Sequence, residues 1–162
     1  MNKIFGTNQR HDGIRQTGRR RWTVYYGFGI EDGADYGWDY RHEFDHLPAI
    51  DEVRSVIFDQ INADTHDTIL QGMTWRGHLV WLSDENQRNY TLWALAAERN
   101  GTMPTVKLGT DEEPYLYTFA DIDEVREFIG AVAAHIDGAI NANRRAKAEI
   151  DWQVFNPEYL LQ

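Results

Sequence analysis

The sequence predicts a single α+β domain of antiparallel β-hairpins and helices, arranged as three successive β-β-α units with the helices on one side. Strict alternation of residue types from Trp38 to His46 indicates a strand with one solvated face, which carries Asp39, Arg41, Glu43 and Asp45. Apolar residues recur at helical spacing in three longer segments. Turns rich in glycine and polar residues separate these segments, and 162 residues suffice to bury a core.

The first unit comprises a hairpin and a helix. Residues 22–28 are rich in Trp, Val and Tyr, which favours a strand, and we expect them to pair with residues 38–46. The apolar spacing then predicts a helix over residues 50–71, interrupted at Asn62-Ala63-Asp64. Gly72 is a plausible stop for this helix.

The second and third units repeat this plan. Ser83 is a natural N-cap, Gly101 is a natural helix stop, and Asp121 with Glu124 forms a capping box. The expected elements are a hairpin over 74–82 around Arg76-Gly77, a helix from 83 to about 99, strands over 105–108 and 115–119, and a helix from 121 to about 147.

The N-terminal segment differs from the rest of the chain in charge. Residues 1–21 carry six basic residues and one acidic residue, contain three glycines and lack a hydrophobic period. They carry a net charge of +5, whereas residues 22–162 carry −15, which gives −10 overall. We therefore expect a basic N-terminal arm over residues 1–21, followed by a single domain over 22–162. The arm should pack on the acidic body of its own or a neighbouring subunit.

Two further patterns concern the organisation of the chain. The pentapeptide Ile50-Asp-Glu-Val-Arg54 recurs as Ile122-Asp-Glu-Val-Arg126, 72 residues later. This recurrence is either a structural repeat or convergent helix-start chemistry, because acidic residues suit the first turn of any helix.

The tail over residues 151–162 is apolar, so we expect it to pack on its own domain rather than on a partner.

His42-Glu43-Phe44-Asp45-His46 matches the H-E-x-x-H pattern of zinc metalloproteases. That pattern binds one metal only on a helix, where residues four apart share a face. On a strand, residues four apart are separated by about 13 Å, since each residue rises about 3.3 Å. We therefore expect no metal at His42 and His46, and a metal-dependent hydrolase using this motif is an alternative hypothesis.

Other patterns give little indication of catalysis. The glycine string from Gly27 to Gly33 leads into a strand rather than a helix, which indicates a hairpin loop and not a dinucleotide site. The acidic turn Asp111-Glu112-Glu113 lacks the spacing of a calcium loop. No Ser/His/Asp spacing points to a triad, although triads are spatial. We expect a noncatalytic protein without a cofactor.

Two sets of residues are candidates for binding. Arg19, Arg20 and Arg21, beside Trp22, could grip phosphate and stack a base, but the acidic remainder of the chain disfavours nucleic acid as a partner. Most strand aromatics should be core residues. Trp38 and Tyr40 could present a surface to a sugar ring or a peptide, so a carbohydrate- or peptide-binding module is a further alternative.

Three segments carry a resemblance to known proteins: residues 80–90, residues 108–114 and the end of the last helix near Ile150-Asp-Trp152. With them, residues 22–152 resemble a family of uncharacterised proteins of Bacteroides-type phages and prophages. The broader relatives lie near tail or tail-fibre genes, and the family has no established catalytic residues. The resemblance implies a phage-derived structural or interaction protein, tail-associated or accessory. Its partners would be phage tail proteins or other copies of the chain.

The expected location follows from what the sequence lacks. The chain contains no cysteine, which excludes disulfides and thiolate chemistry. No apolar run is long enough to cross a bilayer, and Met1 to Arg21 lacks the apolar segment of a signal peptide. We expect a cytoplasmic or virion-associated protein that does not contact membranes.

Overall fold

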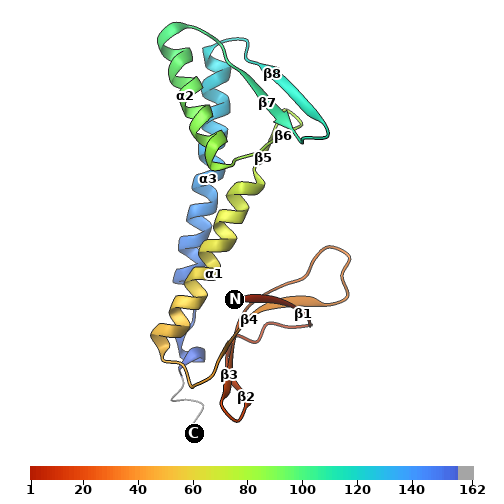
Figure 1. Ribbon diagram of the computed structural model, residues 1–162, viewed down its shortest axis with the longest axis vertical. Coiled ribbons are helices and arrows are strands. Elements are labelled where there is room, and N and C mark those ends of the chain that lie inside the picture. The colour runs from red at the N-terminus through yellow and green to blue at the C-terminus, as the bar shows by residue number, and fades with distance from the viewer. Residues whose placement is uncertain (157–162) are drawn as a thin grey trace. The chain divides into compact units, whose positions relative to one another are not determined.

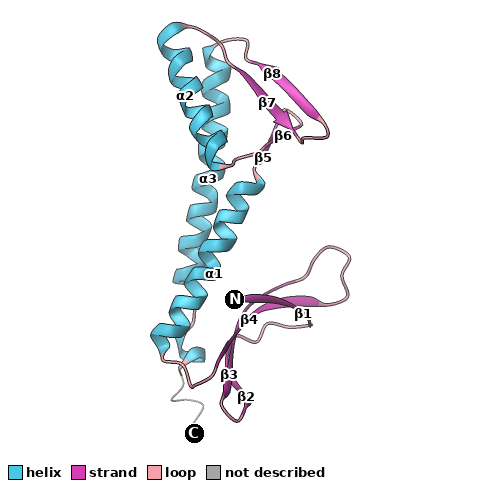
Figure 2. Cartoon of the chain, in the orientation of Figure 1, coloured by secondary structure: helices cyan, strands magenta, loops and turns pink. Residues whose placement is uncertain are grey.

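The computed structural model describes residues 1–156 and confirms an α+β fold with antiparallel hairpins (Figures 1 and 2). The predicted β-β-α order is present three times, preceded by two further strands. The elements in order are β1 (Asn2–Thr7), β2 (Gly13–Gly18), β3 (Arg21–Gly29), β4 (Gly37–Phe44), α1 (Ile50–Gln71), β5 (Met73–Trp75), β6 (His78–Val80), α2 (Asp84–Asn100), β7 (Thr105–Gly109), β8 (Pro114–Thr118), α3 (Ile122–Ala148) and the 3₁₀ helix η1 (Trp152–Phe155).

The chain divides into two compact units, whereas the sequence led us to expect one domain over residues 22–162. Unit 1 comprises Met1–Asn62 and Ala146–Gln162, and unit 2 comprises Ala63–Arg145. Both division points lie inside helices, α1 and α3, so no linker composition marks them in the sequence. Each unit has its own cluster of buried apolar side chains.

Unit 1 contains a four-stranded antiparallel sheet in the order β1-β4-β3-β2. Residues 1–21, expected to be an arm, supply its two edge strands: β1 pairs with β4, and β2 pairs with β3. The arm is therefore part of the domain. Sequence reasoning missed these strands because their stability comes from pairing with later segments, while their glycines and polar residues give no local strand signal.

One face of this sheet packs against α1 and η1. The shared core holds Ile14, Val24, Ile57 and Phe155, each at most 2% exposed. Phe155 belongs to the C-terminal tail, so the expectation that the tail packs on its own domain is confirmed for the described residues. The tail's remaining residues, 157–162, lie outside the part of the chain that the structure describes.

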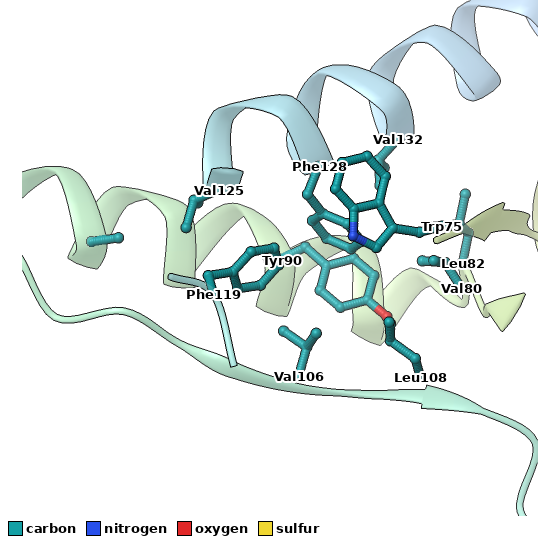
Figure 3. Close-up of a cluster of buried hydrophobic side chains, with 11 residues drawn as sticks. Trp75, Val80, Leu82, Tyr90, Val106, Leu108, Phe119, Val125, Phe128 and Val132 are labelled. Carbon is teal, nitrogen blue, oxygen red and sulfur yellow. The ribbon is translucent and has the colours of Figure 1, made fainter. Parts of the chain in front are cut away.

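Unit 2 packs two short hairpins, β5–β6 and β7–β8, against α2 and the first half of α3 (Figure 3). Phe128 lies at the centre of its core. The Phe128 ring contacts Trp75, Tyr90 and Phe119 edge-on, with centroid separations of 5.5, 5.2 and 5.3 Å. The Trp75 indole Nε1 is buried and has no hydrogen-bond partner within residues 1–156.

The helix ends follow the sequence in most cases. Ser83 caps α2 by accepting a hydrogen bond from the Asn86 amide at 3.2 Å, and Gly101 ends α2 in the left-handed conformation. Gly72 follows α1 with φ +77°, where an added Cβ would lie 2.0 Å from the Val80 carbonyl oxygen. The predicted interruption of α1 at residues 62–64 was wrong, because the helix is continuous there.

Candidate interaction surface

The structure confirms a strand for the first three residues of the H-E-x-x-H segment, but not for Asp45 and His46. His42 and Glu43 lie on β4, and His46 follows the end of that strand. His42 packs edge-on against Phe44 at 4.7 Å, and burial lowers its pKa, with a smaller contribution from the N-terminal ammonium group. His46 Nδ1 lies 2.9 Å from Asp45, and its Nε2 lies 3.1 Å from Glu52 at the start of α1. Within residues 1–156, no three His, Asp or Glu side chains are grouped closely enough to hold a metal ion.

The face of the unit 1 sheet opposite α1 carries a buried polar cluster that the sequence did not predict. The Asp39 side chain, placed on the solvated face by alternation, is only 2% exposed. It accepts hydrogen bonds from Arg41 Nε at 2.7 Å and pairs with His11 Nε2 at 3.1 Å. His11 comes from the connection between β1 and β2, so the covering of Asp39 depends on the strand pairing that local patterns missed.

The arrangement of Asp39, His11 and Thr7 resembles a triad in composition but not in proton geometry. His11 Nδ1 lies 3.1 Å from the Gln9 carbonyl oxygen and 3.5 Å from Thr7 Oγ1. Because a carbonyl only accepts hydrogen bonds, Nδ1 carries a proton in this contact. Thr7 Oγ1 also donates to the Gln9 oxygen, at 3.0 Å. His11 therefore holds the β1–β2 connection over the sheet and is not placed to activate Thr7.

The aromatic candidates are largely occupied by contacts inside unit 1. Trp22 and Tyr40 pack against the core below the sheet. Trp38 contacts the Tyr40 ring at 5.1 Å, and the ammonium group of Lys3 lies 4.4 Å from its centroid. An added Cβ on Gly29 would lie 2.5 Å from the Trp38 ring. Trp38 and Tyr40 are therefore brought together, as the pattern suggested, but Lys3 and Gly29 cover much of the Trp38 indole.

The three consecutive arginines lie at the tip of the β2–β3 hairpin. Gly18 pairs with Arg21 across the hairpin, so Arg19 and Arg20 form its two-residue turn. Both turn residues are exposed, and within residues 1–156 neither has an ion-pair partner. Arg21 Nε lies 3.6 Å from Glu43 on β4. We call residues Arg19, Arg20 and Arg21 the arginine tip.

A hollow of about 470 Å³ lies beside the arginine tip, and Glu43, Phe44 and Asp45 also line it. The two carboxylates there already have partners, since Arg21 pairs with Glu43 and His46 pairs with Asp45. The β2–β3 hairpin, residues 13–29, contains four arginines and no acidic residue. Its unpaired charge is thus available to an external anionic group.

A third polar cluster lies in unit 2, at the start of α3. The Glu124 carboxylate, whose side chain is 10% exposed, accepts hydrogen bonds from the Tyr117 hydroxyl and from the Ala120 amide at 2.7 Å. Arg76 Nη1 lies 2.5 Å from the same carboxylate. These contacts hold the pKa of Glu124 below its usual value, with the Tyr117 hydrogen bond as the largest cause. The same hydrogen bond raises the pKa of Tyr117.

This cluster joins the β5–β6 turn to the start of α3. Arg76 is the first residue of the Arg76-Gly77 turn and has φ +46°, so the tight turn of β5–β6 carries its guanidinium to α3. The capping box is formed in part: the Glu124 amide donates to Asp121 Oδ1 at 2.9 Å, but the Glu124 carboxylate returns to Ala120 instead of Asp121. Each group in the cluster therefore has partners inside unit 2.

Comparisons with known proteins give no match: no protein-family model, curated protein or solved structure corresponds to this chain. Within residues 1–156, no helix combines the length and the apolar character needed to span a bilayer. The phage resemblance and the functional expectations therefore stay predictions. The geometry singles out the arginine tip as the candidate interaction surface.

Proposed function

We propose that the chain is a noncatalytic structural or interaction protein that binds the acidic surface of a protein partner through its arginine tip. One observation carries this proposal: Arg19 and Arg20 are exposed and unpaired within residues 1–156, although the chain has a net charge of −10. With so many carboxylates available, a tip that served only to neutralise its own chain would show ion pairs.

The β-hairpin gives the arginine tip a fixed presentation. The pairing of β2 with β3 holds the two turn arginines at a defined position, so less entropy is lost when they bind than for a free arm. Guanidinium groups pair with carboxylates in a bidentate geometry, which gives direction as well as charge. Exposed ion pairs are worth only about 0–1 kcal/mol each, so the tip should govern association rate and specificity more than affinity.

The nature of the partner follows from the rest of the surface. Nucleic acid would bring dense negative charge close to a chain whose two units each carry an excess of acidic residues. A protein partner can present a small acidic patch to the arginine tip without bringing negative charge close to the acidic remainder of this chain. The resemblance to phage and prophage proteins supports a tail-associated setting, with tail proteins or further copies of the chain as partners.

The two alternatives receive less support from the geometry. A metal-dependent hydrolase would need His42 and His46 on one side of a metal, whereas both lie along an extended segment with ring or carboxylate neighbours. A binding surface on Trp38 and Tyr40 would have to displace Lys3 from the indole face. A specific catalytic turnover abolished by one substitution would contradict the noncatalytic proposal.

The proposal can be tested with a labelled oligoglutamate peptide as a surrogate for an acidic protein surface. Fluorescence anisotropy should detect binding at about 50 mM salt and its loss at about 300 mM, because screening shortens the reach of exposed charges. The double variant R19Q/R20Q should weaken binding at least about fivefold. The control R88Q/R99Q removes two exposed arginines of α2 and should leave binding unchanged.

Two results would contradict the proposal. Equal loss in R19Q/R20Q and R88Q/R99Q would show that only net charge matters. Tighter binding of a single-stranded DNA oligonucleotide through the same arginines would replace the acidic protein with nucleic acid as the partner class. Mass spectrometry of purified virions from a producing lysogen tests the tail-associated setting separately.

A further inference from the structure

A second candidate site lies in unit 2, away from the residues of the proposed function. Trp81 follows β6 and is 56% exposed. Within residues 1–156, no ring or cation stacks on its indole, whereas Trp38, Trp75, Trp93 and Trp152 each contact another ring. An exposed and unstacked tryptophan exposes a large apolar face to water, and this is a cost that proteins accept mostly at binding sites.

The backbone around Trp81 is held firmly. Its neighbours Val80 and Leu82 are fully buried in the unit 2 core, so the Trp81 side chain is directed outward. Its carbonyl oxygen accepts a hydrogen bond from Asn86 Nδ2 at 3.0 Å and lies 3.5 Å from the Tyr90 hydroxyl. The indole therefore projects from an anchored backbone, which favours preorganised binding.

Trp81 lines a hollow of about 430 Å³, within the usual size range of small-molecule sites. Leu79, 37% exposed, supplies further apolar wall. The polar wall is an ion pair: Lys107 Nζ lies 2.5 Å from Asp111 Oδ1, and Lys107 holds the pKa of Asp111 below its usual value. The other lining residues are Asn86, Gly109 and Thr110.

We propose that this hollow binds a pyranose ring of a neutral carbohydrate. The C–H face of the ring would lie on the Trp81 indole, and its hydroxyl groups would contact Lys107 and Asp111. Each sugar hydroxyl is both donor and acceptor, which suits a wall offering ammonium donors beside carboxylate acceptors. An anionic ligand would meet Asp111, with Glu112 and Glu113 next to it in the turn.

The geometry of the turn supports a defined wall. Gly109 has φ +80°, and an added Cβ would lie 2.2 Å from the Glu113 carbonyl oxygen, so only glycine fits this close approach. The Glu113 amide donates to Thr110 Oγ1 at 3.1 Å. These contacts fix the turn that carries Asp111, which lines the same hollow as Trp81. An apolar peptide side chain could pack on Trp81 and Leu79, but it would make no polar contact with the Lys107–Asp111 ion pair.

The probes for this site are neutral tetrasaccharides of glucose, galactose, mannose and N-acetylglucosamine. Titration followed by ¹H–¹⁵N spectra should shift the Trp81 indole signal, which the variant W81A identifies by its absence. At least one of these sugars should bind, and W81A should weaken its binding at least about tenfold, as measured by calorimetry. D111N and K107M should each weaken it to a smaller extent, since each removes one polar contact.

Two matched controls separate a sugar site from a general apolar surface. Leu92 and Leu95 are 62% and 48% exposed on α2 and do not line the hollow, so L92A and L95A should leave sugar binding unchanged. The absence of any shift with all four sugars at about 20 mM would overturn the proposal. Equal weakening in W81A and L92A, or an unchanged affinity in W81A, would overturn it as well. Failure here would leave the arginine-tip proposal untouched, because that proposal concerns unit 1.

Discussion

The starts of α1 and α3 carry the same pentapeptide in two different units, and their shared contacts are local. Arg54 Nη1 lies 2.7 Å from Asp51, and Arg126 Nη1 lies 2.8 Å from Asp123. Val53 and Val125 are both buried. These equivalences hold within each helix, whether the recurrence is a structural repeat or convergent chemistry.

The pentapeptide glutamates differ in their distant partners. The Glu52 carboxylate accepts a hydrogen bond from the Ala49 amide at 2.8 Å and pairs with His46, and its side chain is 45% exposed. The Glu124 carboxylate accepts hydrogen bonds from the Ala120 amide and the Tyr117 hydroxyl and pairs with Arg76, and its side chain is 10% exposed. The glutamate of the same helix-start sequence thus forms an exposed ion pair with a histidine in unit 1 and a nearly buried ion pair with an arginine in unit 2. The difference comes from the hairpins, not from the pentapeptide.

The largest expected effect compares the two cores. Phe128 and Phe155 are each 1% exposed, but Phe128 contacts three aromatic rings, whereas the one ring that Phe155 contacts within residues 1–156 is Trp152, at 5.9 Å. We expect F128A to lower the free energy of unfolding by about 3–5 kcal/mol and F155A to lower it by less. Both substitutions act by removing buried apolar atoms and leaving a cavity. Urea denaturation measures both, with F5A, at an exposed site, as the control. A larger loss in F155A would contradict this ranking.

An intermediate effect compares the two glutamates. E124Q should destabilise unit 2 by about 1–2 kcal/mol, because it weakens the charge-assisted contacts to Arg76 and Tyr117 at a nearly buried position. E52Q should cost less, since Glu52 and His46 are exposed and water competes for their contact. Hydrogen exchange at the first turns of α1 and α3 resolves the two losses. Equal losses of protection would mean that burial does not distinguish the two sites.

The smallest expected effect is a dependence on pH that only unit 1 shows. Asp45 and then Glu52 raise the pKa of His46 above 6.5, so the folded state favours the protonated ring. This stabilisation is complete below about pH 6.5 and is lost as the pH rises through the raised pKa of the folded state. The pKa values of Asp45 and Glu52 are lowered, so their contribution is lost only as the pH falls through those lowered values.

The stability advantage of the parent protein over H46Q, from urea midpoints and from exchange protection at the start of α1, should therefore decline slightly from pH 5 to 9. His42, whose lowered pKa has the opposite effect, is present in both proteins and cancels in this difference. The start of α3 should show no such decline, since Arg76 keeps its charge throughout this range. A decline of equal size at α3 would break the contrast between the two units.

Local chemistry explains which parts of the fold could be predicted. The caps at Ser83 and Gly101 depend on neighbours in the sequence, and both were confirmed. The strand predicted over residues 38–46 is also present, but it ends at Phe44. The edge strands β1 and β2 depend on pairing with β4 and β3, so composition alone suggested an arm. The continuity of α1 through Asn62 depends on packing that no local pattern reports.

The candidate sites follow the same division. The sequence identified the arginines at 19–21, but their position in a turn required the pairing of β2 with β3. Asp39 was placed on the solvated face, since nothing in the alternation indicated that His11 would cover it. Trp81 and Asp111 lie 30 residues apart, and only the packing of the hairpins brings them to one hollow.

The division of unit 1 between the two ends of the chain has a consequence for synthesis on the ribosome. Residues 63–145 form a continuous segment, so unit 2 can complete its core as soon as that segment emerges. The sheet of unit 1 emerges first, yet it lacks Phe155 until all of unit 2 has been translated. During that interval α1 can already cover part of the apolar face, but the part that Phe155 covers stays exposed, and we expect chaperones to bind the nascent chain there.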